Sequence, residues 1–420
     1  MIVNILIFVV GLLVYAGYGL AGFAYLAAAV LISWGAGLLT PKHRWVAWVS
    51  IGLNAGMLLL LKLQPVTGLT LFSVLGMSYF TLQIISYNAD VYQGKYQPEK
   101  NLFRYSLYVT YLPHLFLGPI DRYDRIRTAL FEERRITFDG ILSGAARALW
   151  GGFKKLIIAS RLSVIIGAIS DAPDQYQGAY ALAAVLLYSL QLYADFSGGM
   201  DMVLGVSRML GVRLSENFRE PYLSQTVKEF WNRWHMTLGL WLRDYIYIPL
   251  GGNRKGTVRK YLNLIVTFLV SGLWHGVEYL LWGLFNGIFV ALGDKLKTKW
   301  KTLNRIGVFI AISLLWSFFV WPNALTALKQ LGSIVTTFNY WDFFQTVGTL
   351  GLSTGDWIVL AAALGALWLF DVKKQPLLTG FRSAAPWAKV AVICTLALLV
   401  LVFGMYGIGF NADAFIYSKF

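Results

Sequence analysis

Long apolar runs separated by short polar connections make up most of the chain. Because a helix rises about 1.5 Å per residue, about 20 apolar residues are needed to cross the hydrocarbon core of a bilayer. The pattern therefore predicts an all-α protein with about 10–11 membrane-spanning helices in a single domain, residues 1–420. The runs that reach or approach the required length are 2–15, 20–39, 46–61, 69–85, 141–169, 180–204, 261–292, 306–321, 357–370 and 390–403.

Three stretches depart from this simple pattern. Residues 141–169 form the weakest span because the run contains four basic side chains, Arg147, Lys154, Lys155 and Arg161. Residues 106–118 are mostly apolar but too short for a span, so we expect a re-entrant or interfacial segment. Residues 208–260 are rich in Trp and Tyr and carry ten Lys/Arg against four Asp/Glu. This mixture is typical of helices that lie at the membrane interface or dip into it.

The composition excludes a soluble protein. Hydrophobic residues make up 57% of the chain and charged residues 14%, whereas soluble domains average about 25% charged residues. A net charge of +15 would indicate nucleic-acid binding in a soluble protein. Here the basic residues lie between the apolar runs, as the positive-inside rule describes, so we expect contact with membrane lipids and no nucleic acid partner. The one cysteine, Cys394, excludes an internal disulfide bond.

The charge of the connections predicts a topology in the cell membrane. The basic connections, which we place in the cytoplasm, are 42–44, 95–104, 122–135, 208–260, 295–305 and 373–382. The acidic connections 170–177 and 337–356 then fall outside without contradiction. Because the run 261–292 begins and ends at basic connections, it must enter and leave on one side as a hairpin, with its turn near residues 272–276.

The hairpin turn carries His275 among some thirty mainly apolar residues. An ionisable group inside a membrane segment is costly to bury, so His275 is a candidate functional residue. Three further residues follow at helical spacing and would share its face: Glu278, Trp282 and Asn286. Glycine pairs at 272/276 and 283/287 would allow a helix or a ligand to approach closely. The alternative is a structural histidine that hydrogen-bonds a backbone carbonyl where two helices cross.

A second candidate site follows Thr226. Thr226 and Glu229 form a capping-box pattern, which predicts one helix from Val227 that stops at Pro249. An interfacial helix would explain its Trp and Arg side chains, but it would not explain His235 between them. The segment also carries the neighbouring pair Arg243–Asp244 and a turn at Asn253.

The other chemistry-bearing residues give weaker signals. His43 lies in a basic connection and is expected to be solvated, whereas His114 would line a pore or cap a turn. No spacing typical of metal ligands occurs, so we expect no metal. The sequence also lacks a phosphate-binding loop and a serine-hydrolase elbow, so no motif supports ATP hydrolysis or serine-based hydrolysis.

Several motifs, taken together and in order, resemble the membrane-bound O-acyltransferase (MBOAT) family. The principal motifs are Phe-Trp-Asn-Arg-Trp-His-Met-Thr-Leu at 230–238, Trp-Leu-Arg-Asp-Tyr at 241–245, Ile-Pro-Leu-Gly-Gly-Asn-Arg at 248–254 and Gly-Leu-Trp-His-Gly at 272–276. Supporting motifs are Gly-Pro-Ile-Asp-Arg-Tyr at 118–123, Asp-Phe-Ser-Gly at 195–198 with Asp201, and Glu-Asn-Phe at 216–218. The motif-bearing core spans 118–287 and is most similar to the bacterial branch, which includes alginate O-acetyltransferase and the D-alanyl transfer protein of teichoic-acid modification.

The resemblance implies an enzyme that passes an acyl group from a cytoplasmic thioester donor, acetyl-CoA or an acyl carrier protein, across the membrane. The acceptor would be a hydroxyl of an extracytoplasmic cell-envelope polysaccharide, or a partner transferase on that side. An acetyl group is favoured, and D-alanyl transfer for teichoic-acid modification is the alternative. No bound cofactor is implied.

The resemblance makes His275 the essential histidine and His235 the second catalytic histidine. The residues that we expect to contact substrates are Trp274, Glu278, Asn286, Trp231, Arg233, Trp234, Arg243, Asp244, Asp195 and Asn253. Elementary chemistry agrees, because a hydroxyl attacks a thioester poorly unless a base takes its proton, and neutral imidazole suits that task near pH 7.

Two functions of other classes compete with acyl transfer. A transporter or flippase would also place polar residues in broken helices at mid-membrane depth, but the sequence shows no inverted repeat. A structural membrane scaffold would leave the motifs around His235 and His275 without a purpose.

Overall fold

The computed structural model describes residues 2–68, 74–132, 134–293 and 297–406, and every element in these residues is a helix. The predicted all-α fold is confirmed. The first residues of the predicted run 69–85, Lys295 of a basic connection and the last 14 residues lie outside the described residues. The N-terminal helices are α1 (Ile2–Tyr18), α2 (Leu20–Leu39), α3 (Trp45–Lys62), α4 (Gln64–Thr67), α5 (Met77–Tyr92), α6 (Leu102–Thr110), α7 (Leu112–Leu117), α8 (Tyr123–Arg127) and the π-helix η1 (Thr128–Glu132).

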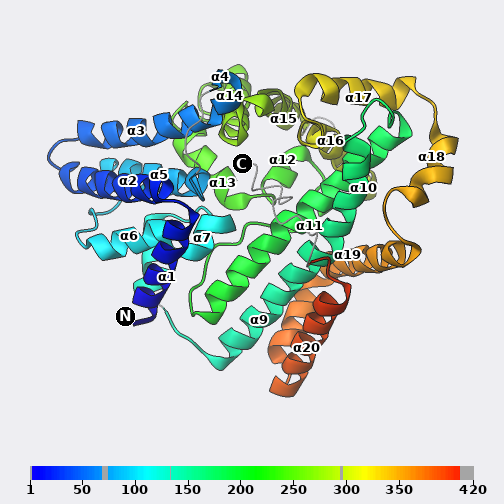
Figure 1. The fold of residues 1–420 in the computed structure, drawn as a ribbon. Coiled ribbons are helices and arrows are strands. Elements are labelled where there is room, and N and C mark those ends of the chain that lie inside the picture. The colour runs from blue at the N-terminus through cyan, green and yellow to red at the C-terminus, as the bar shows by residue number, and fades with distance from the viewer. Residues whose placement is uncertain (1, 69–73, 133, 294–296, 407–420) are drawn as a thin grey trace.

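The central and C-terminal helices follow in chain order (Figure 1). The central ones are α9 (Phe138–Gly152), the π-helix η2 (Phe153–Ala159), α10 (Ser160–Ser170), α11 (Ala179–Met209), η3 (Pro221–Leu223), α12 (Val227–Trp231), α13 (Met236–Leu242), the π-helix η4 (Arg243–Tyr247), α14 (Gly256–His275), η5 (Val277–Tyr279) and α15 (Leu280–Leu292). The C-terminal ones are α16 (Lys301–Val320), α17 (Ala324–Thr336), α18 (Tyr340–Thr346), η7 (Val347–Thr349), α19 (Thr354–Ser383) and α20 (Pro386–Phe403).

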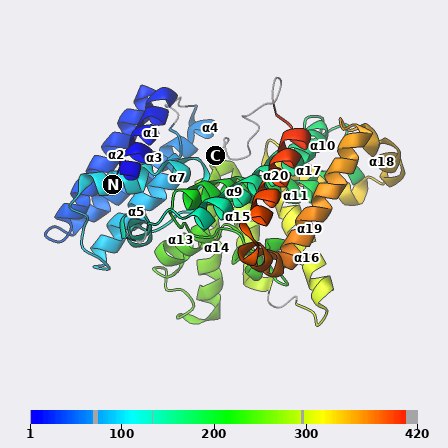
Figure 2. The same cartoon turned by 90° about the horizontal axis from the view of Figure 1, so that it is seen from below.

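Six helices of the described residues are long and apolar enough to cross a membrane: α2, α3, α11, α16, α19 and α20. Most of their bounds agree with the predicted runs, and α2 matches its run residue for residue. Helix α19 differs, because it continues past its run 357–370 and through the predicted connection 373–382, with a kink at Lys373. The other predicted runs contain shorter helices, such as α1 and α15, or helices that carry charged side chains, such as the continuous α9–η2–α10 segment. Figure 2 shows the N-terminal helices at one end of the molecule, α9 and α11 in the middle, and α18 and α19 at the other end.

The long helix α11 packs along α9 in the centre of the molecule (Figure 1). Glycines meet at two crossings, Gly144 with Gly205 and Gly151 with Gly198. A Cβ atom added at Gly198 would lie 2.8 Å from the carbonyl oxygen of Gly151, and one added at Gly144 would lie 2.6 Å from the oxygen of Gly205. Close backbone approach of this kind is common between membrane helices. Because lipid tails are as apolar as the side chains, van der Waals packing at small residues stabilises the contact where the hydrophobic effect does not.

The basic residues that weakened the run 141–169 are paired with acids on neighbouring elements. Arg147 donates to Asp201 at 2.8 Å and to Glu216 at 2.6 Å, and Lys154 donates to Asp201 at 2.7 Å. Lys155 forms a buried ion pair with Asp195 of α11. Arg161 pairs with Asp356 of α19 at 3.1 Å. Acids of α11, α19 and the segment after α11 therefore neutralise the charge inside the run, which is how the membrane segment tolerates it.

The predicted hairpin is present. Helices α14 and α15 run antiparallel and pack against each other over most of their length. Gly272, Gly283 and Gly287 make this possible, because a Cβ atom at any of them would lie within 3 Å of the backbone of the opposite helix. Three of the four glycines noted in the sequence thus serve close packing of the hairpin, and the fourth, Gly276, forms its turn.

The segment 106–118 does not form a span. It is divided between α6 and the six-residue α7, and Tyr111 separates the two helices. His114 is buried, and its Nδ1 lies 3.0 Å from Nε2 of Gln83 on α5. His114 therefore packs inside the N-terminal helices.

The two acidic connections lie side by side. The amide of Asn339 donates to the carbonyl of Gln177 at 3.1 Å, and its Oδ1 accepts from the backbone of Ala179 at 2.9 Å. Lys329 of α17 pairs with Asp174 at 2.7 Å. These bonds hold the connection after α10 against the one after α17. The predicted placement of both connections on one side of the membrane is compatible with this contact.

Candidate active site

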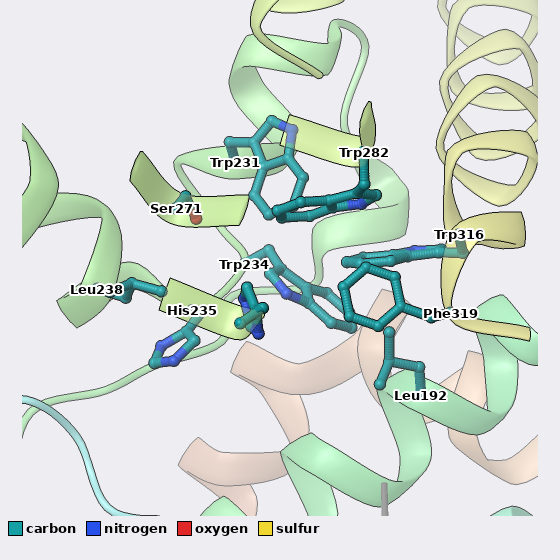
Figure 3. Close-up of a pocket in the computed structure, with 10 residues that line it drawn as sticks. Leu192, Trp231, Trp234, His235, Leu238, Ser271, Trp282, Trp316 and Phe319 are labelled. Carbon is teal, nitrogen blue, oxygen red and sulfur yellow. The ribbon is translucent and has the colours of Figure 1, made fainter. Parts of the chain in front are cut away.

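A small buried cavity lies where the hairpin meets α11, α12, α13 and α16. Ten residues line it: Leu192, Trp231, Trp234, His235, Leu238, Ser271, His275, Trp282, Trp316 and Phe319. Figure 3 shows His235 and Leu238 on one side of the cavity and Trp316 and Phe319 on the other, with Trp231 and Trp282 above. Both histidines that the sequence singled out thus reach one cavity, although 40 positions separate them.

His275 is the last residue of α14 and is buried. The helix ends there because Gly276 adopts a φ of +155°, which side chains disfavour, and a short 3₁₀ turn leads into α15. The imidazole is enclosed by aromatic rings, with centroids of Trp274 at 4.7 Å and Trp282 at 5.4 Å. An apolar enclosure of this kind keeps water away from the ring.

The break after His275 changes one expectation. The predicted common face of His275, Glu278, Trp282 and Asn286 assumed one continuous helix, and that assumption is wrong because the chain reverses at Gly276. His275 and Trp282 meet across the hairpin instead. Glu278 is exposed and interacts electrostatically with Lys62 at the end of α3.

His235 lies at a second break, which the sequence did not predict. The cap at Thr226 is present, with its hydroxyl accepting from the backbone of Glu229 at 3.1 Å, but α12 ends after five residues. His235 then adopts the left-handed conformation, φ 43° and ψ 53°, at the start of α13. Non-glycine residues hold this conformation only where their surroundings impose it.

Tertiary hydrogen bonds impose the break at His235. The backbone N–H of Arg219 donates to the carbonyl of Arg233 at 2.9 Å, and that of Met236 donates to the carbonyl of Asn217 at 3.0 Å. The single predicted helix from Val227 to Pro249 is therefore wrong, because the segment 217–219 takes up backbone groups that a continuous helix would need. Local sequence carries no sign of this pairing.

Four tryptophans form much of the cavity wall, and hydrogen bonds and ring stacking hold three of them in place. Trp231 donates from Nε1 to Oδ1 of Asn286 at 3.2 Å, and Asn286 donates to the carbonyl of Trp282 at 2.9 Å. Trp282 stacks on Trp316 with ring centroids 5.7 Å apart. Asn286 thus supports the wall from behind, and its amide is occupied by the protein itself.

The other predicted substrate contacts lie outside the cavity lining. Trp274 packs behind His275 and donates to the carbonyl of Ser78 at 3.1 Å. Arg233 pairs with Glu229 at 2.6 Å, and Asp195 pairs with Lys155. Whether these three side chains touch a substrate stays a prediction.

Three more of the predicted contacts follow α13: Arg243 and Asp244 in η4 and Asn253 in the turn before α14. Asp244 pairs with Arg122 at 2.8 Å and with Arg243 at 2.9 Å, so these groups form a charged cluster about two helical turns from His235. Asn253 is exposed in the turn before α14. Roles for them in substrate binding remain predictions.

Sequence reasoning assigned no site role to five lining residues, one of which, Leu238, follows His235 by three positions. Ser271 lies one helical turn before His275, so its spacing was a usable signal. Leu192 on α11 and Trp316 and Phe319 on α16 gave none, because apolar residues of a spanning run are not distinguished by pattern. The described residues hold no group of three or more His, Cys, Asp or Glu side chains that would bind a metal ion.

Comparison with known proteins identifies the family. The model of "MBOAT, membrane-bound O-acyltransferase family" matches residues 77–337, which include both histidines and the whole cavity. The chain belongs to the MBOAT family. It is thus a polytopic membrane protein and an O-acyltransferase, and the transporter and scaffold alternatives are set aside.

Similar MBOAT proteins act in the bacterial envelope. The chain is 34% identical over 387 residues to a probable alginate O-acetylase AlgI of Pseudomonas fluorescens, an alignment that covers 88% of this chain and 77% of the relative. It is 32% identical over 297 residues to a peptidoglycan O-acetyltransferase of Helicobacter pylori, covering 62% and 56%. A teichoic acid D-alanyltransferase of Streptococcus thermophilus is 29% identical over 282 residues, covering 63% and 67%. The suspected resemblance is confirmed.

Proposed function

We propose that this MBOAT enzyme transfers an acetyl group from a thioester made in the cytoplasm to hydroxyl groups of an envelope polysaccharide. The donor would be acetyl-CoA or an acetylated acyl carrier protein. The acceptor would be the polymer or a separate extracytoplasmic transferase that passes the group on. The observation that carries the proposal is the meeting of His235 and His275 in one buried aromatic cavity.

The chemistry needs one base and no covalent enzyme intermediate. The acceptor oxygen attacks the thioester carbon, the carbon–sulfur bond breaks, and the hydroxyl proton passes through an imidazole to the leaving thiolate. We assign the base to His275, which ends a buried helix within the cavity wall. Cys394 is exposed on α20 and is not among the residues that line the cavity, and we propose direct transfer without an acyl-cysteine.

The cavity lining favours acetyl over D-alanyl. No acidic side chain occurs among the described residues that line it, whereas a D-alanyl group carries an ammonium that would need a partner once desolvated. The supporting motif at 118–123 makes a structural contact here. Asp121 accepts from the backbone of Ser215 at 3.1 Å and from its hydroxyl.

A donor assay tests the proposal. Purified protein in lipid nanodiscs would receive labelled acetyl-CoA, acetylated carrier protein or D-alanylated carrier protein, with an envelope polysaccharide as acceptor. We expect acceptor-dependent release of thiol from an acetyl donor and little from the D-alanyl donor. Faster turnover of the D-alanyl donor would replace acetyl transfer with teichoic-acid-type transfer.

The variant His275→Ala tests the assignment of the base. Loss of a general base costs about 10²–10⁴-fold in rate, so transfer should fall by at least about 10²-fold while the protein stays folded and inserted. The control is His43→Ala, since His43 is an exposed residue before α3. Near wild-type transfer by a well-folded His275→Ala protein would contradict the assignment.

A further inference from the structure

Asn217 makes an unusual set of contacts around His235. Its side-chain Oδ1 accepts from the backbone N–H of Thr237 at 2.9 Å and from the hydroxyl of Thr237 at 2.9 Å. The same oxygen lies 3.4 Å from Nδ1 of His235. Asn217 is 1% exposed, so all three contacts are shielded from water.

These contacts fix which way the amide points. A backbone N–H can only donate, so the atom of Asn217 that faces Thr237 must be the oxygen. The hydroxyl of Thr237 accepts from the backbone N–H of Ile120 at 2.9 Å, which leaves its own proton for Asn217. The chain of bonds therefore runs from Ile120 through Thr237 to Asn217.

The orientation of the amide then sets the tautomer of His235. Because a carbonyl oxygen cannot donate, Nδ1 of His235 must carry the hydrogen for the two atoms to bond. A neutral ring with hydrogen on Nδ1 has its lone pair on Nε2. That nitrogen is buried and has no hydrogen-bond partner among the described residues, and His235 lines the cavity.

We propose that Asn217 is a positioning residue that holds His235 as the Nδ1–H tautomer, so that Nε2 accepts a hydrogen bond from the bound substrate. This inference rests on the proposed function, because two groups of those substrates offer the required donor. One is an O–H of the sugar acceptor beside the attacking hydroxyl, and the other is an amide N–H of the thioester donor's pantetheine arm. A buried acceptor without a partner costs free energy until such a donor arrives.

Asn217 also has a structural role, and the same chain offers a matched control variant for it. Oδ1 of Asn217 also caps the start of α13 through Thr237, and Asn304 makes the same pair of bonds to Thr298, 2.9 Å to the backbone N–H and 2.9 Å to the hydroxyl. Asn304 lies in the first turn of α16, twelve residues before Trp316 and so about 18 Å from the cavity wall. Asn304→Ala therefore removes the same pair of hydrogen bonds without touching His235.

The first experiment measures the tautomer directly. The chain has four histidines, so nitrogen NMR of full-length protein labelled with ¹⁵N-histidine gives few signals, and the spectrum of His235→Gln assigns the one of interest. We expect Nδ1–H in the wild type and in Asn217→Asp, whose carboxylate also accepts. Asn217→Ala should show a mixture of tautomers.

The second experiment measures transfer by the same variants. Misplacing a substrate group by about 1 Å can cost about 10²-fold, so Asn217→Ala should lower kcat/KM by about 10–100-fold, with Asn217→Asp recovering most of it. Asn304→Ala should lower Tm without changing kcat. A raised KM for the acceptor would show that Nε2 of His235 accepts its hydrogen bond from the sugar O–H. A raised KM for the thioester would show that it accepts from the amide N–H.

Two results would overturn the inference. A wild-type spectrum with hydrogen on Nε2 of His235 would do so whatever the kinetics show, even if Asn217→Ala failed to fold. Unchanged kcat/KM in a folded Asn217→Ala protein would do the same. Failure of the proposed function appears differently, as absence of transfer to any hydroxyl with the Nδ1–H tautomer intact.

Discussion

At the scale of single residues, the structure shows which charged side chains neutralise one another and which polar groups face the cavity where a substrate would bind. Lys155 and Asp195 are both largely buried, and each is the partner of the other. The sequence suggested a substrate contact for Asp195 because its motif resembles the family's. An ion pair between helices 40 residues apart leaves no local pattern, so its existence could not be predicted.

The Lys155–Asp195 pair gives a prediction about stability. Lys155→Met alone should destabilise the protein by about 3–5 kcal/mol, because it leaves a buried carboxylate without a partner. Lys155→Met combined with Asp195→Leu should recover most of that loss. Thermal unfolding in detergent measures both, and Lys329→Ala at the exposed Asp174 pair is the control, with an expected cost below about 1 kcal/mol.

Transfer by the same double variant tests the substrate contact predicted for Asp195. If the pair is only structural, the double variant should keep transfer within a few-fold of wild type. A double variant with wild-type Tm and no transfer would show that Asp195 does bind a substrate.

At the scale of helices, apolar length predicted the spans well, and the breaks within helices were only partly predictable. The hairpin turn followed from charge bias and from glycines near 272–276. The break at His235 did not, because it depends on backbone bonds from the distant segment 217–219. Trp316 could not be predicted as a site residue either. In an apolar run, a tryptophan that lines a cavity and one that faces lipid give the same sequence pattern.

The glycine crossings of α9 and α11 give a prediction at this scale. Gly198→Ala should lower Tm or prevent insertion, because the new methyl group would lie 2.8 Å from the carbonyl oxygen of Gly151. Gly167→Ala on α10 is the matched control, since nothing lies within 4 Å of a Cβ atom there. It should be neutral or stabilise by about 0.5–1 kcal/mol through helix propensity. Equal effects of the two substitutions would show that α9 and α11 do not need close contact.

At the scale of the whole molecule, the contact between the two acidic connections agrees with the topology that charge bias predicts. That topology is testable by labelling. The structure recommends Gln175 as the outer position, because Gln175 is exposed whereas Gln177 is half-buried and bonded to Asn339. Lys299, exposed before α16, is the inner position.

Labelling should distinguish the two sides of the membrane. In a Cys394→Ala background, a cysteine at Gln175 should react with an impermeant thiol reagent added to intact cells, and a cysteine at Lys299 should react only after permeabilisation. The parent Cys394→Ala protein is the control for background labelling. The opposite pattern would invert the assigned topology and place the basic connections outside.

The same topology leads to a prediction about the route by which the proposed donor reaches the cavity. Helix α14 begins at a basic cluster of Arg254, Lys255, Arg259 and Lys260 and ends at His275. Sixteen residues of helix place Arg259 about 24 Å from the histidine. At that distance the cluster cannot act on the reacting thioester, but it can attract an anionic donor such as coenzyme A or an acidic carrier protein.

Reversing these four charges should therefore raise the apparent KM for the donor and leave kcat at saturation nearly unchanged. The salt dependence of KM should also flatten, because screening shortens the reach of charge from about 10 Å at 0.1 M to about 3 Å at 1 M ionic strength. Initial rates across a salt series measure both effects in nanodiscs without anionic lipid, which removes the competing attraction to headgroups. If KM and its salt slope match those of the wild type in a correctly inserted variant, the cluster anchors the protein to lipid headgroups and the donor approaches elsewhere.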